Sequence, residues 1–79
     1  MEAVLFIACK AVEHVEEAIA PALEEFRSKY SVKLAAEPVI EVKEDGSVIV
    51  LVVDCRDKVE AEFLGHKFES ILKRHDLYG

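Results

Sequence analysis

The chain has 79 residues, of which 52% are hydrophobic and 33% charged, and its formal net charge is −6. This length allows one domain at most, spanning residues 1–79, and the composition excludes an intrinsically disordered chain. No apolar run approaches the roughly 20 residues that a membrane-spanning helix needs, and the excess of acids disfavours a protein that binds nucleic acid on its own.

The first half of the sequence predicts a strand and then a helix. Residues 3–9 are continuously apolar, which favours a strand buried on both faces, although a helix running into the next segment is the alternative. From Lys10 to Tyr30 apolar residues recur three or four apart and glutamates occupy the other side, which predicts an amphipathic helix. Pro21 predicts either a kink or the first turn of a second helix.

A hairpin follows this helix. Val32 and Leu34 allow a short strand, residues 39–44 predict a longer one, and Asp45-Gly46 predicts a two-residue type I′ turn into a strand over residues 47–55. That turn places Val42 opposite Ile49. One face then carries Ile40, Val42, Ile49, Leu51 and Val53. The other face carries Val39, Glu41, Lys43, Val48, Val50 and Val52.

The last segment predicts a second helix. Asp57 and Glu60 form a capping-box pattern, the helix extends to about His75, and cationic residues fill its last turn. The complete order is β-α-β-β-α. We therefore predict an α+β fold with a three-stranded, mostly antiparallel sheet and two helices on one face.

Two of the predicted strands are apolar on both faces, whereas two helices cover only one face of a sheet. We therefore predict an interface on the second face, formed by Val39, Val48, Val50 and Val52. The expected occupant is a second copy of the chain or a different protein subunit, and an unpaired edge strand offers a second route to association. The alternative is that β-branched residues simply fill these strands.

Few residues suggest chemistry. Cys9 and Cys55 each end a predicted strand. If these strands are antiparallel neighbours, the two residues lie at opposite ends of the sheet, and we expect buried free thiols; a disulfide, as intracellular hyperthermophile proteins use, is the alternative. His66 and Glu69, three apart on a helix, are too few for a metal site. Asp54, Arg56 and Asp57 cluster where a strand meets a helix and form a possible polar site. With no catalytic motif in the sequence, we expect no enzyme activity, no cofactor and no metal.

The sequence lacks Asn, Gln, Thr and Trp entirely. An amide-poor composition rich in Glu and Lys is typical of hyperthermophiles, because amides are thermolabile; chance in a short chain is the alternative. No basic segment precedes the first apolar run, so we expect no signal peptide and a cytoplasmic location.

The stretches EVKEDGSVIVLVVDCRD and KVEAEFLGHKFESIL give the chain an outline that resembles the small KH-like subunit of KEOPS. KEOPS is the archaeal and eukaryotic complex that makes threonylcarbamoyladenosine on tRNA. The resemblance implies an archaeal, non-catalytic subunit that dimerises, bridges catalytic subunits and helps to engage tRNA, although the acidity argues against direct tRNA binding by this chain alone. A paralogue that caps or competes with that subunit matches equally well. The alternative function is a small-ligand or regulatory domain with a truncated ferredoxin-like shape.

Overall fold

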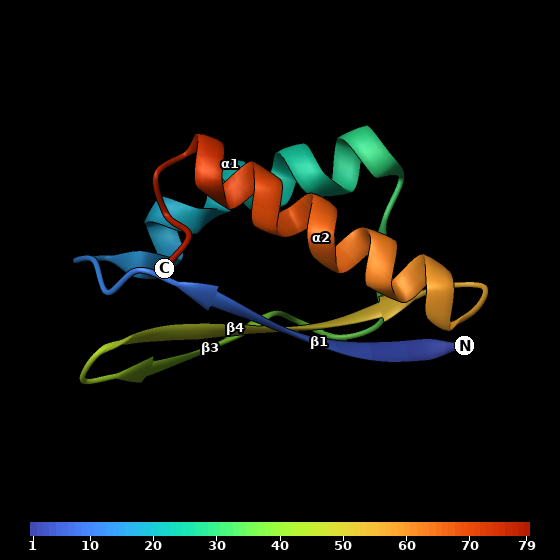
Figure 1. Cartoon of the computed structure of the whole chain (residues 1–79), viewed down its shortest axis with the longest axis horizontal. Coiled ribbons are helices and arrows are strands. Elements are labelled where there is room, and N and C mark those ends of the chain that lie inside the picture. The colour runs from blue at the N-terminus through green and yellow to red at the C-terminus, as the bar shows by residue number, and fades with distance from the viewer.

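The computed structural model describes residues 1–79 and consists of one sheet with both helices on the same face (Figure 1). The elements in chain order are β1 (Glu2–Cys9), α1 (Val15–Tyr30), β2 (Lys33–Leu34), β3 (Val39–Lys43), β4 (Gly46–Asp54) and α2 (Lys58–Arg74). This arrangement confirms the predicted α+β fold. The sheet has four strands rather than three, because the short strand that Val32 and Leu34 allowed is present as β2.

The long strand β4 lies at the centre of the sheet and is antiparallel to each of the other strands. β1 pairs with β4 along its whole length, from Glu2 opposite Asp54 to Cys9 opposite Ser47. β2 and β3 follow one another along the other side of β4. The sheet is therefore three strands wide, as predicted, with one edge line divided into two strands.

The predicted register of the hairpin is wrong by two residues. Lys43 pairs with Gly46, so the loop is Glu44-Asp45, and Val42 lies opposite Ser47 instead of Ile49. Gly46 takes a φ of 153°, which glycine adopts readily, whereas Asp45 has no positive φ and the predicted type I′ turn is absent. Because a slip of two residues preserves the alternation of side chains, both predicted faces keep their members.

Helix α1 is shorter than predicted. The chain needs the residues from Lys10 to His14 to pass from the sheet layer to the helix layer, and His14 turns it with a left-handed φ of 51°. Pro21 lies within a single continuous helix, so the alternative of a second short helix is wrong. Neither helix is long and apolar enough to cross a membrane.

The hydrophobic core lies between the helices and the face of the sheet that they cover. Phe26 of α1 and Phe68 of α2 are both fully buried, and their ring centroids lie 4.9 Å apart. On the sheet side the core receives Ile49, Leu51 and Val53 of β4, which are also completely buried. Glu25 of α1 pairs with Arg74 and His75 at the C-terminal end of α2 and so connects the two helices.

Candidate functional site

The side of the sheet that faces away from the helices is the main candidate site. Alternate residues of β4 point to this side, and the register places Val4, Phe6 and Ala8 of β1 beside Val52, Val50 and Val48. Val39 of β3 lies next to Val50 on the other flank. We call this surface the open face; its apolar members are Val4, Phe6, Ala8, Val39, Val48, Val50 and Val52.

The open face exposes large apolar side chains in adjoining positions. Phe6 is 71% exposed, and Val4 and Val39 are each 53% exposed, while Val48, Val50 and Val52 are half-buried only by their neighbours within the sheet. Phe6, Val50 and Val39 form one row straight across the three strands. Scattered exposed apolar residues are ordinary on protein surfaces, but a contiguous patch usually marks an interaction site.

Charged residues border this apolar area at both ends of the strands. At one end, Glu2 and Lys33 flank Asp54. At the other end, Glu41 lies beside Val48 and Lys43 beside Gly46. The apolar centre with mixed charges at its rim has the anatomy of a protein interface, in which polar residues surround a desolvated middle.

All four residues of the predicted interface lie on the open face, while Val4 and Phe6 were missing from that prediction. A continuously apolar strand has no alternation that could identify which residues face outward. The pairing of β1 with β4 decides that, and it joins positions about 40 to 50 residues apart in the sequence. The only available signal was that residues 3–9 are apolar on both faces.

The three residues of the possible polar site at the end of β4 each contact a nearby residue rather than one another. The Asp57 carboxylate accepts a hydrogen bond from the backbone N–H of Glu60 at 2.8 Å and caps α2, as the capping box predicts. Arg56 donates through its side chain to Glu60 at 2.9 Å. Asp54 lies 3.9 Å from the amino group of Met1. These three residues therefore lie close in sequence but do not converge on a common point.

The cysteines and histidines are also separate from one another. Cys9 and Cys55 are free and buried at opposite ends of the sheet, as expected, and burial raises the pKa of the Cys9 thiol. His66 lies 3.3 Å from Glu69, and His75 ends α2 at 3.1 Å from Glu25. No group of three or more potential metal ligands exists.

The C-terminal segment after α2 folds back against the end of β1. The backbone N–H of Lys10 donates to the carbonyl of Leu77 at 2.7 Å, and the Lys10 ammonium contacts Asp76 at 2.6 Å. This ammonium holds the pKa of the Asp76 carboxyl below its usual value. Tyr78 donates its hydroxyl proton to Glu69 at 3.1 Å, and this bond to a carboxylate raises the pKa of Tyr78.

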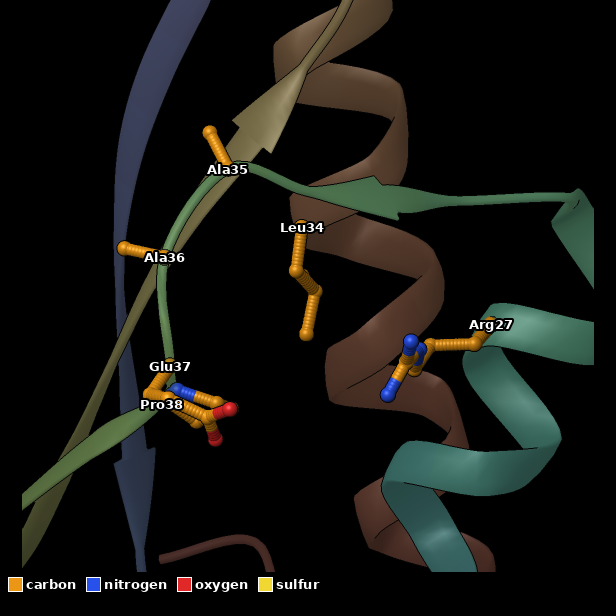
Figure 2. A pocket seen from close by; sticks show the side chains of 6 residues that line it. All are labelled: Arg27, Leu34, Ala35, Ala36, Glu37 and Pro38. Atoms are coloured by element: carbon orange, nitrogen blue, oxygen red, sulfur yellow. The ribbon is translucent and has the colours of Figure 1, made fainter.

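A pocket of about 280 Å³ lies between the end of α1 and the segment that joins β2 to β3. Figure 2 shows the guanidinium of Arg27 and the carboxylate of Glu37 pointing toward each other across it, with Leu34 between them. The two groups form no ion pair within 4.0 Å. This pair is not evident from the sequence, because residues 35–38 have no periodic pattern and only their path in the fold brings Glu37 opposite Arg27.

No family model, no curated protein and no solved structure matches this chain.

Proposed function

We propose that the chain is a non-catalytic adaptor subunit that forms a homodimer through its open face. The observation that carries this proposal is the row of Phe6, Val50 and Val39 across an uncovered sheet. Exposed apolar side chains gain free energy when a partner removes them from water, at about 25 cal/mol per Å². A partner that covers this face would complete a two-sided burial of the sheet.

A second copy of the chain fits this face well. A two-fold axis brings the same patch from both copies together, so the apolar centre of one meets the apolar centre of the other. Two sheets stack in this way about 10 Å apart in β-sandwiches. Each charged end of the patch carries both acids and lysines, so ion pairs between the copies are available around the rim.

The non-catalytic role is supported by the contacts that the titratable groups make. Asp57 caps a helix, Arg56 pairs with Glu60, and His75 joins the two helices through Glu25. Each of these groups already has a structural partner. A catalytic base or nucleophile needs instead to lie beside a position that a substrate can reach.

The assembly that we propose for this adaptor is a cytoplasmic, archaeal complex of the KEOPS type, acting on tRNA. This part of the proposal is supported by the sequence resemblance, and the observed β-α-β-β-β-α order, in which β2 is only two residues long, is compatible with it. With a net charge of −6, the chain would contribute to tRNA modification by joining protein subunits rather than by holding the phosphate backbone alone. Co-purification with the catalytic subunits of an archaeal KEOPS complex tests this assignment, and failure to co-purify at micromolar concentrations would contradict it.

Size-exclusion chromatography with light scattering tests the homodimer. The wild-type chain is expected at twice its mass of 8.9 kDa at micromolar concentration. Val50→Lys, which buries a charge in the centre of the interface, is expected to shift it to monomer. The matched control is Val42→Lys, because Val42 is 71% exposed on the other side of the sheet and should leave the dimer intact. A monomeric wild type, or a dimer in the Val50 variant, would contradict the proposal.

The pocket of Arg27 and Glu37 favours a second candidate function, the binding of a small ligand. A molecule with both a carboxylate and an amino group could bridge the two unpaired charges. The open face supports association better, because Arg27 and Glu37 are both exposed and bury little of a ligand. A thermal-shift screen with zwitterionic small molecules distinguishes the two, since a bound ligand raises the melting temperature by mass action.

A further inference from the structure

The outer edge of β1 has free backbone hydrogen-bonding groups. In an antiparallel ladder, successive residues direct their N–H and C=O groups to opposite sides. The bond from the N–H of Cys55 to the carbonyl of Met1 shows that odd-numbered residues of this strand face β4. The backbone N–H and C=O groups of even-numbered residues therefore point away from β4, in the plane of the sheet, and β1 has no strand on that side. The outward residues are Glu2, Val4, Phe6 and Ala8.

The C-terminal segment sets the length of this free edge. Lys10 is the next outward residue, and its N–H is already bonded to Leu77, while its ammonium contacts Asp76. Any strand added beyond Ala8 would collide with this segment. An incoming strand can therefore pair over residues 2–8 and no further.

A groove runs beside this free edge, between β1 and α2. Its volume is about 280 Å³, and β1 contributes residues 4–7 to its wall. On the helix side, Gly65 leaves the groove open, and a Cβ atom there would lie 4.0 Å from the Leu5 side chain, an ordinary contact distance. A strand added to β1 would direct alternate side chains into this groove, as in other cases of strand addition beside a helix.

The rim that α2 adds to this groove is acidic. Its polar members are Glu62, His66 and Glu69, with no lysine or arginine among the lining residues. Glu62 takes part in none of the ion pairs of the molecule, whereas Glu69 contacts His66 and Tyr78. The uncompensated charge favours a basic segment in the groove.

This charge also argues against a second copy of the chain at the same edge. Pairing β1 with β1 of another copy around a two-fold axis would bring the two α2 helices side by side. Glu62 and Glu69 of one copy would then face the same residues of the other. Like charges in such contacts are unfavourable, so a partner of opposite charge suits the edge better than self-pairing.

We propose that the free edge of β1 and the groove beside α2 bind an extended basic segment of a different protein. The segment adds as a strand over residues 2–8. On the side that faces α2 it carries an apolar residue at Gly65 and a lysine or arginine two positions before and after it. Glu62 and Glu69 lie about 10 Å apart along the helix, and the two basic residues lie about 13 Å apart along the strand, within reach of both.

The test uses a dye-labelled, acetylated peptide containing Lys-Val-Leu-Val-Lys and measures fluorescence anisotropy against the full chain. Saturable binding is expected at low salt, and the charge-reversed peptide containing Glu-Val-Leu-Val-Glu is expected not to bind. Val4→Pro removes an outward N–H without touching the bonds to β4, and should weaken binding at least tenfold. Val42→Pro is the matched control, because it removes an outward N–H from β3 at the opposite edge.

A second variant keeps the test decisive if Val4→Pro does not fold. Glu62→Lys, on the exposed side of α2, should remove the preference for the basic peptide, because Glu69 is then the only acidic residue of the groove. Equal binding of both peptides by the wild type, binding of neither, an unchanged preference in Glu62→Lys, or equal effects of the two proline variants would overturn the proposal. A wild-type dimer that persists in Val50→Lys but is converted to monomer by Val4→Pro would also overturn it, since the edge, and not the open face, would then bind a second copy. Val50→Lys should leave peptide binding unchanged, which separates this edge from the open face.

Discussion

The two faces of β4 carry the same kinds of residue in opposite environments. Ile49, Leu51 and Val53 are completely buried under the helices, whereas Val48, Val50 and Val52 are half-buried on the open face. Neither β-propensity nor hydrophobicity distinguishes the two sets. The difference arises because both helices lie on one side, so the burial of a strand residue depends on what covers it. The open face therefore has core-like composition without core-like contacts.

The largest expected effect on the free energy of unfolding comes from truncating one residue of β4 on each face to alanine. Leu51→Ala is expected to lower the free energy of unfolding by about 2–5 kcal/mol, because it leaves a cavity in a packed core. Val50→Ala should cost about 1 kcal/mol or less within the monomer, because its side chain is only half-buried. Urea unfolding followed by circular dichroism at low protein concentration measures both. Equal costs would mean that the open face is packed as tightly as the covered one.

A smaller effect is expected from removing the N-terminal cap of α2, one of the two helices that cover the sheet. Asp57→Ala removes the cap of α2, and should lower the free energy of unfolding by about 1 kcal/mol. Asp54→Ala is the control, since Asp54 is exposed and makes only a 3.9 Å contact with Met1, so its change should stay within about 0.5 kcal/mol. Thermal unfolding measures both variants. If the two variants lose the same free energy of unfolding, the cap does not stabilise α2.

The smallest effect is expected at Lys10. Here the C-terminal segment covers the edge of β1, which is free only over residues 2–8. Asp76 has a lowered pKa in the folded chain, so its pair with Lys10 stabilises this segment above the ordinary Asp pKa and is lost as the pH falls through the lowered value. Asp76→Asn keeps a residue type that tolerates the φ of 57° and removes the charge.

Hydrogen exchange at the Lys10 amide measures this change. At neutral pH the amide should exchange faster in the Asp76→Asn variant than in the wild type, because its acceptor Leu77 is held less firmly. At a pH below the lowered pKa the two proteins should exchange alike. Identical exchange at neutral pH would show that the ion pair does not hold the segment.

The alternation along residues 39–55 was sufficient to predict the two faces, even though the turn was misplaced. A slip of two residues moves Val42 from Ile49 to Ser47 but turns no side chain to the other face. The capping box at Asp57 was predictable because helix caps depend on neighbours in sequence. The start of α1 was not, since His14 adopts a left-handed conformation that periodicity does not reveal.

The candidate surfaces were predicted only in part, for a reason common to both. Val39, Val48, Val50 and Val52 could be assigned from local pattern, whereas the share of β1 in the open face depends on pairing between distant segments. The groove at Gly65 likewise requires knowing that α2 lies beside the free edge of β1. Contacts between distant segments are set by the whole fold, and no short window of sequence contains them.

The central position of β4 has a consequence for synthesis. β1 leaves the ribosome well before its pairing partner, which lies about 40 to 50 residues later in the chain. At a synthesis rate of about 5–20 residues per second, Val4 and Phe6 remain without a paired strand for roughly 2–10 s. During that interval the same apolar strand that later borders the groove is exposed to other nascent chains. β3, by contrast, pairs with β4, which follows it directly in the chain, so β1 is the strand that we expect to benefit more from early protection by a chaperone.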